Sequence, residues 1–425
     1  MSRTRFATAA WAAVASAAVA TGSVEAAVNE AEFEQLKAQM ATLMQRVSVL
    51  EQENAELRES TATAVSELKL TRGPVAAPPA RSPDHWTDSM RLSGDFRYRY
   101  EEIDVSARDV RSRHRLRARA GFVAQLPNEV EVGLRIAAGN EAPASGNTTL
   151  GSGGSSKELF LDQAYATWRP FEGAYLSGGK MKNNFYRPQG SGLLWDSDYT
   201  PEGIALGWSG NGVFLNATAI GLESDSNRGN HTFYYGVQSG FTVALGEGLA
   251  LTAGAGYIDI PVQGETVFFG DSDDFYGNTF SCGTSDRCTY NNNFEELELF
   301  SDLTWRGMAQ PLAVYAHYVQ NLDADAYDTG WLVGARVGKA DGAGSWDLGY
   351  QYERVEADAV LGLLRDSNVA GGGADIRGHK LFGTYAVDKQ WHMGLTIYVD
   401  NEAGENAFGA ARDYDRVVLD TLFKY

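Results

Sequence analysis

The sequence has little cysteine, a deficit of basic residues and few long apolar runs. Two cysteines among 425 residues cannot hold a fold of this size together. Lysine and arginine number 36 against 55 acidic residues, for a net charge of −19, whereas nucleic-acid-binding proteins are usually basic. After the N-terminus, charges or glycines interrupt every apolar window before it could form a membrane-crossing helix. These deficits argue against a nucleic-acid partner and against a helical membrane protein.

The two cysteines, Cys282 and Cys288, lie in the stretch SCGTSDRCT. In an exported protein they can form a disulfide, which would close only a small local loop. Two thiols without nearby histidines fall short of a zinc ligand set, so no metal is expected, and no motif indicates a cofactor.

The N-terminus has the pattern of an exported protein. Arg3 and Arg5 precede the apolar run FATAAWAAVASAAVATG, and Val24 and Ala26 are the small residues of a cleavage site. We therefore predict a signal peptide at residues 1–26. A membrane anchor is the alternative, but the run is alanine-rich and short for a span of about 20 strongly apolar residues.

Residues 27–60 carry a heptad repeat that predicts a coiled coil. Charges at the flanking positions are complementary for parallel chains, which favours an oligomer. The alternative is a single amphipathic helix that packs on its own domain. An asparagine in the core favours dimers, so the number of chains stays open between two and three. Residues 61–88 form a proline-rich linker. The predicted core positions are Phe33, Leu36, Met40, Leu43, Val47, Leu50, Asn54 and Leu57.

From about residue 90 onward, apolar and polar residues alternate with the period of β-strands. Tight connections such as PN, GEG and DKQ alternate with the long connections 140–157, 182–200, 260–293 and 357–374. The last strand ends in the aromatic Tyr425. An even number of strands with short turns at one end and long loops at the other is typical of a bacterial outer-membrane barrel. The expected strands are 91–101, 110–126, 129–139, 158–169, 173–182, 201–209, 212–222, 231–246, 248–259, 294–306, 311–321, 329–339, 344–356, 375–387, 391–401 and 412–425.

The fold predicted from these patterns is all-β. A 16-stranded antiparallel transmembrane β-barrel spans residues 89–425, and an α-helical coiled coil precedes it in the periplasm.

The stretch RSRHRLRARA places an arginine at every second position, which puts all five on one face of a strand. Charges about 7 Å apart repel by about 0.6 kcal/mol in water and more in a less polar medium, so this face needs water or counter-charge. We expect the arginines to line a water-filled lumen and to form a net positive wall, because few carboxylates are close in sequence. Salt bridges to carboxylates of the same strands are the alternative. The expected wall residues are Arg97, Arg99, Arg111, Arg113, Arg115, Arg117, Arg119 and Arg135.

Four stretches resemble the Putative porin family of Gram-negative outer membranes and, more distantly, the phosphate-selective porins: RLSGDFRYRYE, RSRHRLRARAGF, GKMKNNFYRP and DSDYTPEGIA. The resemblance implies passive diffusion of small hydrophilic solutes, commonly through homotrimers, in contact with outer-membrane lipid and lipopolysaccharide. It also implies that 182–200, the third external loop, folds inward and narrows the lumen, although an ordinary surface loop is the alternative. The residues expected there are Lys180, Lys182, Arg187, Asp196 and Asp198.

We therefore expect an anion-favouring porin and no enzyme, since no Ser/His/Asp arrangement stands out in the sequence. The alternative function is a structural anchor or envelope tether acting through the coiled coil.

The coil generates one prediction. Changing both Leu43→Ser and Leu50→Ser removes two apolar core layers, so self-association should weaken while the barrel still folds. Chemical crosslinking of the purified variant measures the oligomer. An undiminished oligomer would show that barrel contacts suffice.

Overall fold

The computed structural model describes residues 89–139, 141–224, 232–283, 287–404 and 410–425. The predicted signal peptide, coiled coil and linker lie outside these residues. The described part is almost entirely β-sheet, and none of its short helices is long and apolar enough to cross a membrane. The barrel strands are β1 (Arg91–Val105), β2 (Arg111–Leu126), β3 (Val130–Ala138), β5 (Leu159–Trp168), β6 (Ala174–Lys180), β7 (Glu202–Gly210), β8 (Val213–Glu223), β9 (Thr232–Gly246), β10 (Leu249–Ile260), β13 (Phe294–Trp305), β14 (Leu312–Asn321), β15 (Thr329–Gly338), β16 (Trp346–Val355), β17 (Ile376–Ala386), β18 (Trp391–Ala403) and β19 (Arg412–Lys424).

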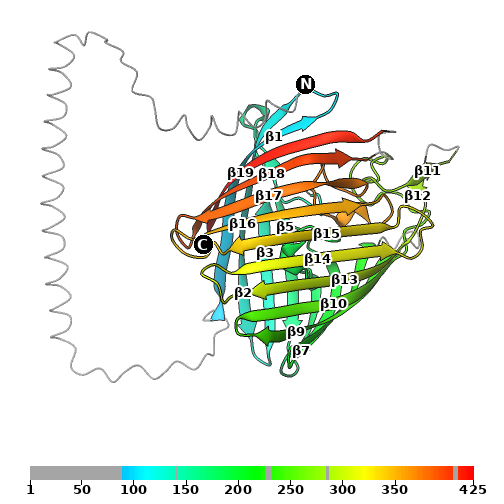
Figure 1. Ribbon diagram of the computed structural model, residues 1–425. Helices are drawn as coiled ribbons and strands as arrows, with labels where there is room; N and C mark the ends of the chain where they lie inside the picture. Colours follow the sequence, from blue (N-terminus) through cyan, green and yellow to red (C-terminus); the bar gives the residue numbers. More distant parts are fainter. Residues whose placement is uncertain (1–88, 140, 225–231, 284–286, 405–409) are drawn as a thin grey trace, which may run out of the picture. The chain divides into compact units, whose positions relative to one another are not determined.

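These sixteen strands pair antiparallel with their neighbours, and β1 also pairs with β19, so the sheet closes into a barrel (Figure 1). The short strand β4 (Thr148–Thr149) joins the same sheet by pairing with β2. The predicted sixteen-stranded barrel is confirmed. The largest difference in strand bounds is at β1, which runs to Val105 rather than ending near residue 101.

The outer face of the barrel is apolar. On β16, Trp346, Leu348 and Tyr350 are each more than 40% exposed, whereas Asp347 and Gln351, which occupy the alternate positions, are buried. Aromatic side chains such as Trp346 and Trp391 stand near the short turns, and others such as Tyr257 on β10 stand near the long loops. Alternation of apolar outward and polar inward residues, with aromatic side chains at both levels, is the pattern of a lipid-facing barrel.

Three external loops pack together inside the barrel. They are loop 3 (residues 181–201), loop 5 (residues 261–293) and loop 7 (residues 356–375), and all three contribute to one buried apolar cluster. Trp195 from loop 3, Phe275 from loop 5 and Leu361 from loop 7 are each at most 2% exposed. The sequence marked 260–293 only as a long connection, but apolar residues of this loop such as Phe275 are shielded from water inside the barrel.

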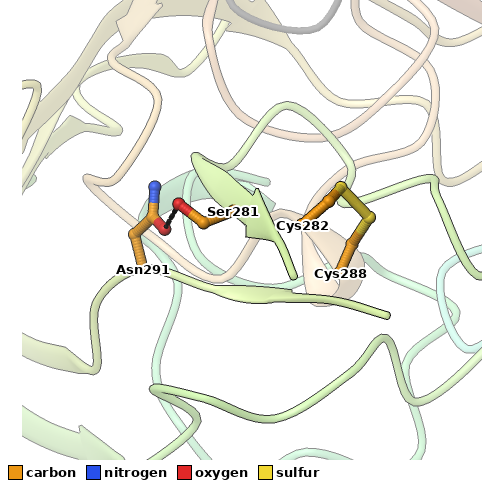
Figure 2. The surroundings of a disulfide bond; sticks show 4 residues. All are labelled: Ser281, Cys282, Cys288 and Asn291. Carbon is orange, nitrogen blue, oxygen red and sulfur yellow. Dashed lines mark hydrogen bonds between the residues drawn. A yellow bond between two sulfur atoms is a disulfide. The ribbon is translucent and has the colours of Figure 1, made fainter. Parts of the chain in front are cut away.

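The hairpin of β11 (Phe280–Cys282) and β12 (Cys288–Tyr290) extends loop 5, and in Figure 1 it projects beyond the barrel strands. A disulfide joins Cys282 and Cys288 across this hairpin, and the Ser281 hydroxyl donates a hydrogen bond of 2.7 Å to Asn291 Oδ1 (Figure 2). The bond braces a local turn and connects no two barrel strands.

The seam between the first and last strands requires a glycine. Gly94 and Tyr425 exchange two backbone hydrogen bonds of 2.8 and 3.1 Å. A Cβ atom at position 94 would lie 2.4 Å from Arg119 O and 2.5 Å from the Tyr425 ring. The terminal aromatic residue therefore packs directly over the Gly94 backbone.

We predict that Gly94→Val destabilises the barrel by about 1–3 kcal/mol, because the added side chain overpacks the closing seam. The midpoint of urea unfolding in detergent or lipid measures this loss. Gly178→Ala on β6 is the matched control, since an added Cβ there meets nothing within 4 Å. Equal midpoints for the two variants would contradict the prediction.

Candidate pore constriction

The arginines of β2 project into the barrel beside those of β1. The register places Arg97 opposite Arg117 and Arg99 opposite Arg115, so like charges face each other directly across the two strands. Such pairs are destabilising unless other groups compensate them. The compensation comes from carboxylates and from two loops.

Seven arginines share four carboxylates on this wall. The most buried carboxylate, Glu101, is 0% exposed and contacts Arg113, Arg115 and Arg416. Arginine therefore outnumbers carboxylate. We expected the arginine side chains to be in open water, but Arg115 and Arg117 are buried, at 8% and 6% exposure. The remaining pairs are Arg97 with Asp198, Arg99 with Asp420, Arg117 with Asp95 and Asp198, and Arg119 with Asp95 and Asp198.

Two loops close over the arginines. In loop 2 (residues 139–158), Asn147 accepts hydrogen bonds from Arg97 at 2.6 Å and, through its backbone oxygen, from Arg115 at 2.9 Å. Asp198 of loop 3 lies 2.7 Å from Arg117 Nη1 and also accepts the Gly146 N–H at 3.0 Å. Asp198, one of the residues expected at the constriction, is thus in direct contact with the arginine wall.

An acidic row lies on the opposite wall. Glu296, Glu298 and Asp302 share the inward face of β13, which is eight strands away from β2 around the barrel in either direction. All three are at most 5% exposed. Sequence reasoning missed this row, although its period of two is the same signal that identified the arginines. The lumen therefore has one basic and one acidic wall.

The acidic wall holds the first half of loop 3. Asp302 Oδ2 accepts hydrogen bonds from the Tyr186 hydroxyl at 3.0 Å and from Gln189 at 2.8 Å. Ser191 Oγ lies 2.9 Å from His317 Nδ1, and His317 Nε2 lies 2.7 Å from Glu298 Oε1.

This Ser191–His317–Glu298 arrangement has the connectivity of a catalytic triad. All three residues are at most 2% exposed, so no substrate reaches the serine. A nucleophile must meet its substrate, and these hydrogen bonds instead fix loop 3 to the barrel wall.

The second half of loop 3 is held by loop 7. The Asp196 N–H donates to Leu364 O at 2.8 Å, and Asp196 Oδ2 accepts from the N–H and hydroxyl of Ser367 at 2.9 and 3.2 Å. The sequence marked 357–374 only as a long connection and gave no sign that it folds inward.

The other residues expected at the constriction are dispersed. Lys180 pairs with Glu202 at 2.6 Å on the outward face of β6 and β7, so its expected place in the lumen is wrong. Lys180 follows Leu176 by four residues, and in the alternation of β6 it therefore shares the outward face of Leu176. The remaining ones are Lys182, which is exposed; Arg187, which donates to Trp195 O at 2.9 Å; Arg111, exposed at the outer end of β2; and Arg135, paired with Asp162.

The two acids of loop 3 differ in protonation. Burial, together with the nearby charges of Asp366 and Asp198, raises the pKa of Asp196 to about 7. Burial alone would also raise the pKa of Asp198, but Arg117 and Arg97 outweigh it and hold that pKa at about 2. Within the described part of the chain, no group of three or more His, Cys, Asp or Glu residues could hold a metal ion.

Glu101→Gln should destabilise the barrel by about 3–5 kcal/mol, because three arginines lose the charge of their shared buried partner. Urea unfolding in lipid vesicles measures the effect. Glu202→Gln, at an exposed pair on the outer face, should cost at most about 1 kcal/mol. If the two variants are equally stable, Glu101 does not stabilise the wall.

The raised pKa of Asp196 predicts a pH-dependent junction between loops 3 and 7. A carboxyl whose pKa is raised by folding stabilises the folded arrangement most below its ordinary pKa, and this contribution is lost as the pH rises through 7. Current fluctuations in single-channel recordings should therefore increase from pH 5 to pH 8. Asp196→Asn should remove most of this pH dependence. An unchanged pH profile in that variant would assign the titration to another group.

Comparisons with known proteins identify a family and a fold for this chain. The model of the Putative porin family matches residues 103–267 and 286–422. The high-pH structure of Pseudomonas putida OprB has a TM-score of 0.54 and 11% identity, covering 80% of this chain and 95% of that chain. Salmonella typhi OmpF in complex with daunomycin has a TM-score of 0.49 and 12% identity, covering 80% and 99%. A loop-deletion variant of Vibrio cholerae OmpT has a TM-score of 0.48 and 11% identity, covering 80% and 100%. No curated protein matches the chain in sequence.

The likeness to OprB supports the barrel fold alone, whereas the family match extends over most of the chain. The chain therefore belongs to the Putative porin family and is a porin-like outer-membrane channel, not an enzyme.

Proposed function

We propose that the protein is a passive diffusion channel for small hydrophilic solutes that favours anions. The observation that carries this proposal is the excess of arginine on this wall, where six guanidinium groups of β1 and β2 and one of β19 share four carboxylates. The local field of a narrow passage, rather than the net charge of the chain, selects permeating ions.

The most accessible of these arginines are the ones that a solute would meet. The side chains of Arg113 and Arg119 are 20% and 17% exposed, whereas the acids of β13 are buried beneath loop 3. Among the four carboxylates of the wall, only Asp420 is as accessible as these arginines, at 21%, while Asp95 and Asp198 are 14% and 12% exposed and Glu101 is fully buried. Two accessible arginines against one accessible carboxylate would leave a solute beside a net positive charge.

The proposal also includes the oligomeric state and the surroundings of the channel. We assign the channel to a homotrimer surrounded by outer-membrane lipid and lipopolysaccharide, with residues 27–60 as a periplasmic coiled coil. The repeat of apolar residues in that segment supports self-association.

The test is the double variant Arg113→Gln and Arg119→Gln. No carboxylate is left alone, because Glu101 keeps Arg115 and Arg416, while Asp95 and Asp198 keep Arg117. One charge about 7 Å from an ion contributes about 0.6 kcal/mol in water, roughly threefold in occupancy. The reversal potential in a salt gradient should therefore shift toward cations.

The matched control is Arg354→Gln with Arg377→Gln, which removes two charges from half-exposed positions at the outer ends of β16 and β17. It should leave the reversal potential near that of the wild type. A cation-selective wild type, or equal shifts in the two double variants, would refute anion selection by the arginine wall. Arg115 and Arg117 are not changed in this test, because both are buried and their loss would disturb packing as well as charge.

A further inference from the structure

Loop 7 is fixed to loop 3 and to the barrel wall by one buried arginine. Arg365 is 0% exposed, and its Nε donates to Leu193 O of loop 3 at 3.1 Å. Its Nη1 donates to Gly373 O at the far end of loop 7 at 2.7 Å, and its Nη2 lies 2.8 Å from Glu353 on β16. One guanidinium group therefore joins the two loops to the wall.

Loop 5 supports loop 7 from the outer side. The Asn278 amide donates to Ala357 O at 2.6 Å and to Val360 O at 2.8 Å, and its oxygen accepts the Gly362 N–H at 2.9 Å. Residues 357–365 of loop 7 are all buried, whereas residues 366–368 are partly exposed. The other open positions between residues 357 and 374 are Gly371 and Gly372, so residues 366–368 carry the accessible side chains of this segment and form its tip.

This tip lies against the basic wall. Asn368 Oδ1 accepts from Arg99 at 3.0 Å, and Asn368 O accepts from Arg416 at 3.0 Å. Asp366 Oδ2 lies 3.8 Å from Lys380 Nζ, and the side chains of both residues are partly exposed, at 13% and 23%. The tip therefore places a carboxylate beside Lys380 of β17, two residues from the asparagine that contacts β1 and β19.

We infer that residues 366–368 form a second lip of the constriction, in which Asp366 reduces the anion preference and Arg365 positions the lip. The charge part of this inference rests on the proposed diffusion of ions through the lumen. The inference that the lip limits the size of permeating solutes does not depend on which ions the channel prefers. Arg365 acts through loops 3 and 7 and meets no solute.

The size of the lip is tested with Arg365→Met combined with Glu353→Gln, which removes both charges of the buried pair. Loop 7 should loosen, so single-channel conductance and the size limit for neutral polyethylene glycols should both increase. Heat-modified migration on gels verifies that the barrel itself is folded. An unchanged polymer limit in a folded variant would overturn the positioning role of Arg365.

A crosslink separates loop movement from a general loss of structure. A Cβ atom at Gly330 on β15 would lie 3.5 Å from Ala359 Cβ of loop 7, within the usual range for a disulfide. We add Gly330→Cys and Ala359→Cys to the double variant. Oxidation to the new disulfide should restore the wild-type polymer size limit, and reduction of this disulfide should raise the limit again. Reductant on the double variant alone controls for the native disulfide. A limit that stays large after oxidation would mean that loop 7 is not the lip.

The charge of the lip is tested with Asp366→Asn, which keeps the shape of the side chain. The reversal potential should shift toward anions, with roughly a threefold higher permeability ratio, while the polymer limit stays constant. Asp341→Asn in the exposed turn between β15 and β16 is the matched control. No shift relative to this control would overturn the role of Asp366. If the arginine wall proved not to select anions, the polymer measurements would still decide the position of the lip.

Discussion

The shortage of negative charge beside the arginines of β1 and β2 determines how the interior of the barrel is arranged. Guanidinium groups that face each other across two strands repel unless acceptors surround them. The wall itself supplies Asp95, Glu101 and Asp420, which is too few for seven arginines. The remaining acceptors come from loops: Asn147, Asp198 and Asn368 each reach a different part of the wall. Pairing of buried charge thus fixes where three loops end inside the lumen.

The width of the barrel explains why loops rather than side chains fill the interior. Sixteen strands enclose a space too wide for side chains to meet across it. Loops 3, 5 and 7 fill part of this space with an apolar cluster that includes Trp195, Phe275 and Leu361. Their polar groups reach the walls, since buried backbone groups need hydrogen-bond partners. The same packing that narrows the passage therefore also makes it rigid.

The strands were predictable because each has a lipid-facing and a lumen-facing side, which forces a period of two on the sequence. The same period identified the arginines and could have identified the acids of β13. The position of loop 7 could not be read in this way, because its contacts join residues far apart in the sequence, as Arg365 does with Leu193. Lys180 was misplaced because it lies at the end of a short strand, where one position decides between lumen and outer face.

The two charged walls are unequal in a way that residue counting does not reveal. Glu296 and Glu298 are at most 2% exposed: Leu361 of loop 7 donates to Glu296, and Glu298 is joined to Ser191 of loop 3 through His317 of β14. Arg113 and Arg119 keep part of their surface in water. The acids of β13 therefore serve mainly to hold the loops. Acids at the outer surface have little influence on ions more than about 8 Å away, because salt screens their charge. An acidic protein can in this way present a basic passage, because burial rather than composition decides which charges a solute meets.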